Sequence, residues 1–460
     1  MIGLVLQSEE GGQREEPINR VRASFLLSAL GDFEQEPESR AANVRGSFAF
    51  GDRTMTVEIR PITDAEVEQA EYIVAYSFNS PERRDLAPAV ERARRVFSTE
   101  WSLGSFEDGE MTAFVRTLPM AMRINGRGLS FGAIGPVVSL PQHRRKGHVG
   151  ALLKRALEVM RERGQVLSGL HTPHPSLYRR YGWEIASVRR VYSFAPKDIA
   201  LAVQPGERGR IRMLRPDDWS QADRVYRVHS AKRNGAVHRG EVWWREAIFG
   251  TSGPNHGDVA LWENASGEAE GYVVYYQATQ AGEDWPPAFW VRELVAISRD
   301  AYLNLISHLL RHDLPREIVW NAPPDDPFRT AIVDAGRLTV REDYDVMLRI
   351  CDVEQALRQR PPANAERPLE LTMRVTDSSA AWNDGTWRVE IADGAVEVER
   401  VEGEADIELS ATTLAPVFNG FLSPTQGALA GLIRARSEEA LSTADALFAV
   451  LYRPFCADGF

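Results

Sequence analysis

Arg144, Arg145 and Lys146 stand directly before Gly147 and the start of an amphipathic segment. From Gly147 onward apolar residues recur every three or four positions, which predicts a helix with Gly164 as its C-cap. The first N–H groups of a helix have no acceptor inside it, and the helix dipole adds positive charge there. Three basic side chains at such a turn predict an anion site, and we expect the anion to be a pyrophosphate.

A basic turn before a helix is also common as a plain solvated loop. The segment lacks both the G-x-x-x-x-G-K-[ST] pattern of a P-loop and the G-x-G-x-x-G pattern of a dinucleotide fold. Its pattern R-x-K-G-x-x-G resembles the coenzyme A pyrophosphate loop of the GCN5-related N-acetyltransferases (GNAT), with Val149 where that family usually has Gly or Ala. The resemblance implies acetyl-CoA as cosubstrate. Arg144 either joins the pyrophosphate site or makes a structural ion pair.

Two sets of residues are expected to hold this cosubstrate. The pyrophosphate is expected on Arg145, Lys146, Gly147, His148, Val149 and Gly150. The pantetheine arm is expected to pair with the backbone of Val137, Val138 and Ser139, as an added strand would.

A second group of reactive residues follows the predicted strand 166–170. Acyl transfer from a thioester to an amine requires the ammonium to lose a proton, and it is helped when the departing thiolate gains one. Tyr178, which opens a short helix after the strand, is placed to serve the thiolate; the alternative is a half-buried aromatic with a satisfied hydroxyl. His171 and His174 are alternative acid–base candidates, and Tyr181 is expected to be the likelier core residue of the two tyrosines.

Composition limits the class of protein. A chain of 460 residues suggests about three domains, and 43% apolar residues suffice for real cores. The net charge of −11 argues against a nucleic-acid partner and suits cationic substrates. The two cysteines, Cys351 and Cys456, have no metal-binding or disulfide spacing, so we expect buried thiols and no metal. No membrane span or signal peptide is evident, and a cytoplasmic protein is expected.

The chain divides by composition into four parts. Residues 1–54 are polar and predict a disordered leader or a mis-assigned start before Met55. Residues 55–196 alternate strands and helices in a mixed α/β order, with a hairpin formed by Phe106–Val115 and Leu118–Ile124. Residues 197–357 repeat this order without a basic glycine turn, which indicates a second copy that has lost the pyrophosphate loop. A linker then leads to residues 366–460, where short strands and two helices predict an α+β domain.

The C-terminal part resembles the sterol-carrier-protein domain in its strand order and in Trp382-Asn-Asp-Gly-Thr-Trp387. With this domain included, Met55–Phe460 resembles the enhanced-intracellular-survival (Eis) acetyltransferases, which have a GNAT domain, a GNAT-like domain without cofactor and a sterol-carrier-like domain. Two internal motifs and the terminus carry the resemblance. They are Val137-Val-Ser-Leu-Pro-Gln-His-Arg-Arg-Lys-Gly147, Leu177-Tyr-Arg-Arg-Tyr-Gly182 and Phe455-Cys-Ala-Asp-Gly-Phe460.

The resemblance implies roles for residues that spacing alone does not assign. It makes Tyr178 the general acid and the free carboxylate of Phe460 the general base, and the family tolerates a residue such as Val149 in its loop. It also implies tandem GNAT domains, a hexamer, and cationic acceptors such as aminoglycosides or lysine side chains. Direct attack is expected, because no Cys or Ser nucleophile stands beside a base. The alternatives are a protein or peptide N-acetyltransferase, and a non-enzymatic protein that binds lipid or coenzyme A.

Overall fold

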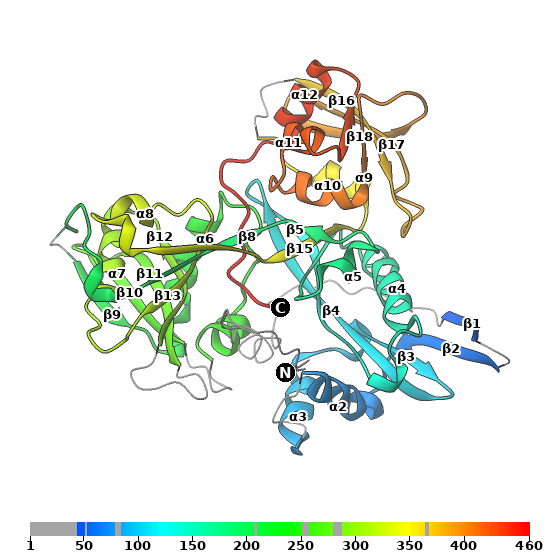
Figure 1. Cartoon of the computed structure of the whole chain (residues 1–460), viewed down its shortest axis with the longest axis horizontal. Helices are drawn as coiled ribbons and strands as arrows, with labels where there is room; N and C mark the ends of the chain where they lie inside the picture. Colours follow the sequence, from blue (N-terminus) through cyan, green and yellow to red (C-terminus); the bar gives the residue numbers. More distant parts are fainter. Residues whose placement is uncertain are drawn as a thin grey trace, which may run out of the picture.

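The structure is a computed structural model. It describes residues 44–50, 53–78, 84–206, 209–250, 257–278, 288–363 and 368–460. Three mixed β-sheets of eight, seven and five strands organise these residues. Figure 1 shows the two larger sheets side by side and the smallest one above them. The mixed α/β architecture with two related units and a smaller third one confirms the predicted fold class.

The first sheet has the strand order β1-β2-β3-β4-β5-β6-β15-β7. Its strands are β1 (Val44–Phe50), β2 (Arg53–Pro61), β3 (Ser102–Glu107), β4 (Glu110–Ile124), β5 (Arg127–Ser139), β6 (Leu167–His171), β15 (Val346–Ile350) and β7 (Glu184–Ile185). Its helices are α2 (Val67–Ser77), α3 (Ala87–Val96), α4 (His148–Glu162) and α5 (Pro175–Arg179). Helix α4 connects β5 to β6, which run parallel and therefore need a crossover of this kind.

The sheet begins inside the segment that we expected to be a leader. Strand β1 pairs antiparallel with β2, with Val44 opposite Ile59 and Phe50 opposite Arg53. Residues 1–43 and 51–52 lie outside the described residues. The division at Met55 stays a prediction, but β1 and the start of β2 precede it as parts of the sheet.

The second sheet has the order β14-β8-β13-β12-β11-β10-β9. Its strands are β14 (Thr339–Tyr344), β8 (Val188–Phe194), β13 (Ile318–Ala322), β12 (Ala288–Ala296), β11 (Ala269–Ala278), β10 (Asp258–Asn264) and β9 (Gly209–Met213). Its helices are α6 (Trp219–Ser230), a π-helical turn (Trp243–Ile248), α7 (Arg299–Leu310) and α8 (Phe328–Ala331). Strands β12 and β13 are parallel and joined through α7, as β5 and β6 are joined through α4.

The two larger sheets exchange strands. Strand β8 leaves the first unit and pairs with β13 and β14 of the second sheet. Strand β15 returns after the second unit and pairs with β6 and β7 of the first sheet. The expected boundary near residue 196 thus follows a strand that already belongs to the second sheet, and each unit is completed by the other.

The predicted hairpin of Phe106–Val115 and Leu118–Ile124 is wrong, because most of the first segment and all of the second belong to the single strand β4. Strand β4 continues through Arg116 and Thr117 with a bulge, while the turns fall at Asp108-Gly109 and at Asn125-Gly126. Both residues of each turn have positive φ, which two-residue hairpins favour. Arg116 stays in the strand because it is buried and donates to Glu71 at 2.8 Å.

The third sheet has the order β18-β17-β16-β19-β20. Its strands are β16 (Leu369–Thr376), β17 (Gly385–Ala392), β18 (Ala395–Val401), β19 (Ile407–Ser410) and β20 (Ile433–Ala435). Its helices are α9 (Val353–Gln359), α10 (Ala411–Phe418), α11 (Pro424–Leu429) and α12 (Glu438–Phe448). Apolar side chains of β16, β17 and α10 form one continuous core.

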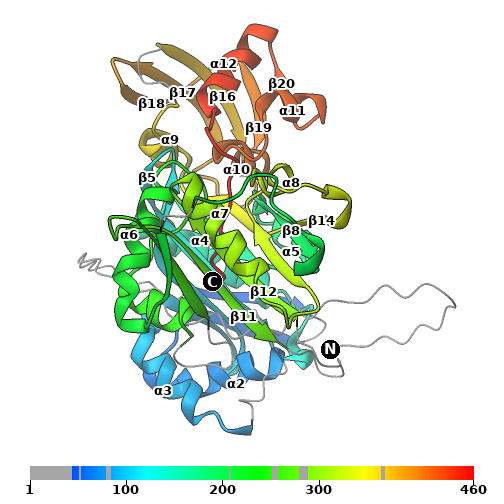
Figure 2. The same cartoon turned by 90° about the vertical axis from the view of Figure 1, so that its left-hand side faces the viewer.

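The last twelve residues, 449–460, form the C-terminal tail. In Figures 1 and 2 the tail runs down from α12 and ends at the centre of the molecule, between the two larger sheets. Cys456, Asp458 and Phe460 are each less than 5% exposed, so the end of the chain is part of the interior. Among the described residues no helix has the length and apolarity needed to cross a membrane.

Candidate active site

The parallel strands β5 and β6 separate at the place where the pantetheine arm is expected. They pair only from Phe131 opposite Leu167 to Ile134 opposite Leu170. On its other side β5 stays paired with β4 as far as Ser139 opposite Ala113. Residues 137–139 therefore have one edge outside the β5–β6 pairing. An extended ligand carrying amide groups can hydrogen bond to such an edge as a strand would.

The predicted pyrophosphate loop lies between β5 and α4. Gly147 is the N-cap of α4 with φ 93°, a left-handed conformation that suits glycine, and it offers no side-chain acceptor to the helix. The first helical bond runs from Ala151 N–H to the Gly147 carbonyl. Arg144 and Arg145 are exposed, and Arg144 donates to the Ser139 carbonyl at 3.4 Å rather than to a carboxylate. The loop therefore combines helix N–H groups with basic side chains, as the sequence predicts.

The second glycine of the loop allows a close approach. A Cβ atom on Gly150 would lie 2.0 Å from the Tyr181 hydroxyl oxygen. Tyr181 is half-buried and packs against the apolar cluster below α4, whereas Tyr178 is buried within that cluster, so the prediction that Tyr181 is the likelier core residue of the two is wrong. Gly150 is thus needed because the ring of Tyr181 supports the first turn of α4.

The corresponding helix of the second unit has an occupied N-terminus. At the start of α7 the Ser298 hydroxyl accepts a hydrogen bond from Ala301 N–H at 3.2 Å, and Asp300 lies in the first turn. An anion placed there would compete with the hydroxyl and meet a negative charge. The N-terminus of α7 is therefore less suited to an anion than that of α4.

The imidazole of His148 does not face the solvent side of the loop. It is 3% exposed, and its Nδ1 lies 2.9 Å from the Ser105 hydroxyl oxygen. Burial is the largest influence on this ring and lowers its pKa. The carboxylate of Glu107 lies below the loop, 2.9 Å from His143 Nδ1 and 3.5 Å from Lys146 Nζ. For His148 only the backbone N–H remains suited to the predicted pyrophosphate contact.

Tyr178 lies in α5, beside the end of β6. Its side chain is buried among residues such as Leu170 and Trp183. Burial raises its pKa to about 12, although a hydrogen bond with Thr172 opposes the shift. The hydroxyl therefore keeps its proton throughout the neutral range and is available as a hydrogen-bond donor.

Phe460 is buried against the first sheet. Its ring centroid lies 5.4 Å from that of Phe131 on β5 and 4.8 Å from that of His171 at the end of β6. The structure thus brings the terminal residue to the same pair of strands that carries the predicted cofactor edge. His171 is engaged with the tail, because its Nε2 lies 3.0 Å from the Asp458 carbonyl. His174 is exposed and precedes α5.

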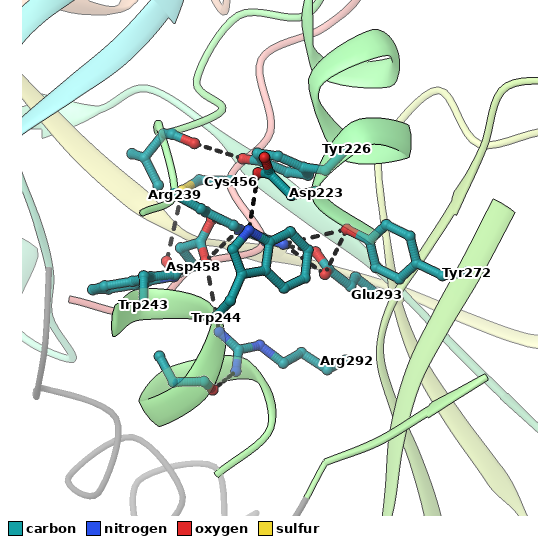
Figure 3. A network of polar contacts seen from close by, with 12 residues as sticks. Asp223, Tyr226, Arg239, Trp243, Trp244, Tyr272, Arg292, Glu293, Cys456 and Asp458 are labelled. Atoms are coloured by element: carbon teal, nitrogen blue, oxygen red, sulfur yellow. Dashed lines mark hydrogen bonds and ion pairs between the residues drawn. The ribbon is translucent and has the colours of Figure 1, made fainter. Parts of the chain in front are cut away.

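A buried polar network holds the tail two residues before its end (Figure 3). The Asp458 carboxylate accepts from Arg239 Nε at 3.0 and 3.1 Å and from Trp243 Nε1 at 2.7 Å. Arg239 also donates to both oxygens of Glu293, at 2.8 and 2.7 Å. Burial opposes the charge of Arg239, but the two carboxylates raise its pKa well above the usual range. The network fixes Asp458 to the second unit by ionic contacts shielded from water.

A cavity of about 100 Å³ lies beside the tail. Its lining includes His171, Trp290, Arg292, Asp345 and Gly459. Arg292 lies 3.7 Å from Asp458, and His171 Nδ1 lies 3.3 Å from Asp345. The cavity adjoins the terminal residues and is lined by aromatic, acidic and basic side chains.

Sequence reasoning missed the residues that hold the tail. Arg239, Trp243 and Glu293 belong to the second unit, and no local pattern connects them to Asp458, which is 219 residues away from Arg239. The only signal was an acidic residue in an otherwise apolar terminal segment. The two cysteines are buried free thiols, as expected.

Comparisons with known proteins agree with this architecture. Residues 58–186 and 235–350 match acetyltransferase (GNAT) domain families, and residues 353–457 match a sterol carrier protein domain. An uncharacterized N-acetyltransferase of Streptomyces avermitilis is 29% identical over 425 residues, covering 88% of this chain and 99% of that protein. The N-acetyltransferase Eis of Mycobacterium tuberculosis is 25% identical over 344 residues, covering 72% of this chain and 80% of that protein.

A solved structure extends the likeness to three dimensions. The crystal structure of Eis1 from Mycobacterium abscessus has a TM-score of 0.73 and 27% identity, and covers 87% of this chain and all of that one. The chain is therefore an N-acetyltransferase built of two GNAT domains and a sterol-carrier-like domain. Within that class it is an Eis-like GNAT protein, as the sequence resemblance implied.

Proposed function

We propose that this N-acetyltransferase transfers the acetyl group of acetyl-CoA by direct attack to an amine of a cationic acceptor, of the aminoglycoside or lysine kind. The observation that carries the proposal is the position of Phe460. Its ring is buried against Phe131 and His171, which lie on the two strands that separate at the proposed cofactor edge. A carboxylate that ends the chain there is beside the place where the thioester would lie.

In this proposal acetyl-CoA lies along β5. Its pantetheine amides pair with the edge at Val137, Val138 and Ser139, and its pyrophosphate meets the N-terminus of α4. Arg145 and Lys146 add positive charge at the pyrophosphate, together with the N–H groups of His148, Val149 and Gly150. GNAT proteins use acetyl-CoA as cosubstrate, and the free edge and the uncapped helix fit it.

The carboxylate of Phe460 takes the proton of the attacking amine. The acceptor arrives as an ammonium, gives one proton to the carboxylate, and its nitrogen lone pair forms a bond to the thioester carbon. The nitrogen of the resulting intermediate is positively charged and loses a second proton to solvent, which balances the proton that the sulfur gains. An α-carboxylate in water is a weak base, with a pKa of about 3.3–3.7, and removal from water makes a carboxylate more basic. Phe460 is 3% exposed, which supports this role.

Tyr178 stabilises the departing sulfur. As the carbon–sulfur bond of the tetrahedral intermediate breaks, the electron pair goes to sulfur and the Tyr178 hydroxyl donates to it. Its pKa of about 12 makes it a weaker acid than an ordinary thiol, with a pKa of about 8.5, by more than a thousandfold. Hydrogen-bond donation to the developing thiolate is therefore the larger part of its role, with full proton transfer completed from solvent.

An amine panel tests the proposal. Purified enzyme with acetyl-CoA is offered an aminoglycoside, a linear polyamine and a lysine peptide, and released thiol is measured. We expect turnover with the polycationic acceptors, and loss of turnover but not of coenzyme A binding when Phe460 is deleted. Acetylation of peptide α-amines alone would favour the peptide N-acetyltransferase. Unchanged turnover after the deletion would refute the role of the terminal carboxylate.

The oligomeric state follows from the resemblance alone. We propose a hexamer of the 51.5 kDa chain. Light scattering coupled to gel filtration would give six chain masses, whereas a monomer or dimer would contradict it.

A further inference from the structure

Three potential metal ligands meet beneath the pyrophosphate loop. Glu107 ends β3, His143 precedes the loop and His148 opens α4. One ligand atom from each lies within 4.8 Å of the other two. The Glu107 Oε2 atom is 2.9 Å from His143 Nδ1 and 3.6 Å from His148 Nε2. Two imidazole nitrogens and a carboxylate oxygen are the ligand set of many zinc sites.

The separations suit a single ion. Bonds of about 2.0–2.1 Å at tetrahedral angles place neighbouring ligand atoms about 3.3 Å apart. The two measured separations, 2.9 and 3.6 Å, lie on either side of that value. The third separation, between the two imidazole nitrogens, is within 4.8 Å, so side-chain rotations that shorten it would bring Glu107 and both imidazoles onto one ion.

The state of His148 points to a missing ligand. Its Nδ1 is held by the Ser105 hydroxyl at 2.9 Å, while its Nε2 has no hydrogen-bond partner among the residues that the structure describes, although the residue is 3% exposed. A buried polar atom without a partner is uncommon and requires an explanation. In metal sites one ring nitrogen is oriented by such a hydrogen bond and the other binds the ion. The Nε2 atom faces Glu107, so the cluster is arranged as a metal site would be.

We propose that Glu107, His143 and His148 bind one divalent transition-metal ion of the zinc class and thereby brace the pyrophosphate loop. When the ion binds, the proton between His143 Nδ1 and Glu107 must move to Nε2 of the His143 ring or leave the site. Lys146, which is 3.5 Å from Glu107, is then released toward the anion side of the loop. The expectation of no metal rested on cysteine spacing, which this His–His–Glu set does not use.

Zinc binding by the full-length protein tests the site. Protein treated with chelator and desalted is titrated with Zn²⁺ against a chromophoric competitor, without coenzyme A. We expect one equivalent bound at micromolar affinity or tighter, and weakening of at least about tenfold in His148→Leu and Glu107→Gln. Ser105→Ala should weaken binding by about 10–100-fold because it removes the orienting hydrogen bond. His308→Ala is the matched control, because His308 and His312 form another histidine pair, with ring centroids 5.1 Å apart.

The outcomes separate this inference from the proposed function. Cobalt-loaded protein should show visible absorption bands that His148→Leu lacks, while melting temperatures show that the variants are folded. Equal zinc affinity in wild type and His148→Leu, or loss of binding in His308→Ala instead, would overturn the site. Zinc binding in a protein that fails to bind coenzyme A would leave the metal site standing and refute the cofactor assignment.

Discussion

The substitution Asp458→Asn is expected to release the tail and abolish most turnover without unfolding the protein. Asp458 is 1% exposed and accepts three hydrogen bonds, two from Arg239 and one from Trp243. Asparagine has the same shape, but its amide carries no charge and turns a donor toward Arg239. The tail then loses the contact that holds it two residues before Phe460.

The magnitude follows from the charges in the network. Arg239 and Arg292 face Glu293 and Asp458, and removal of one carboxylate leaves one uncompensated cation in the interior. Breaking a buried pair in this way costs about 3–5 kcal/mol. Undocking of the tail exposes Phe460, which costs about 2–3 kcal/mol. The difference, about 1.5 kcal/mol in favour of the undocked tail, lowers the docked fraction, and with it kcat, by about tenfold.

The assay measures kcat by thiol release, together with the melting temperature and the proteolytic cleavage of the tail. Glu293→Gln is the matched control, because it removes a carboxylate from the same Arg239 but does not touch the tail. We expect both variants to melt earlier, with kcat lost only in Asp458→Asn. Equal kcat in the two variants, or wild-type kcat in Asp458→Asn, would refute the reasoning.

Three further predictions concern the first unit. Tyr178→Phe should lower kcat by about 100-fold with unchanged acetyl-CoA binding, and an unchanged kcat would contradict it. Because the pKa of Tyr178 is about 12, the hydroxyl loses its proton only at higher pH, so the wild-type pH–rate profile should show no basic limb from this residue below pH 10. Gly150→Ala forces a Cβ to within 2.0 Å of the Tyr181 hydroxyl and should raise the KM for acetyl-CoA about tenfold, which Val149→Ala should not do.

The controls for these predictions use binding as well as rate. Coenzyme A affinity measured by calorimetry should fall in Gly150→Ala and stay at the wild-type value in Tyr178→Phe. A loss of coenzyme A affinity in Tyr178→Phe, with wild-type affinity in Gly150→Ala, would contradict the roles assigned to the loop and to the tyrosine.

The local sequence pattern was enough to predict most helices and strands, but not which strands pair with one another. Helix α4 and its loop follow from apolar spacing and from Gly147, which is the N-cap with positive φ. The strand exchange was not predictable, because β8 and β15 look like ordinary strands of the units in which they occur along the chain. The missed turn at Asp108-Gly109 shows that an Asp-Gly pair outweighs an apparent break at Arg116, whose charge is satisfied inside the core.

Only those parts of the candidate site that lie within one short segment of the chain were predictable from the sequence. Arg145 and Gly147 could be placed at the helix start from spacing, and Tyr178 after its strand. The position of Phe460 came from family resemblance, and its support by Arg239 depends on contacts between units that no local pattern encodes. The inward direction of the His148 side chain was not predictable, since a basic segment does not reveal which of its residues turns inward.

The central claim is that the terminal carboxylate acts as the base, and the chain permits a direct test. Cys456 allows a synthetic Cys-Ala-Asp-Gly-Phe peptide to be joined to residues 1–455 by native ligation, with Phe460 ending either as a carboxylate or as a carboxamide. The two proteins differ by one charge and keep the same side chains. We predict that the carboxamide loses at least about 100-fold in kcat at unchanged acetyl-CoA affinity. Equal kcat in the two proteins would contradict the account.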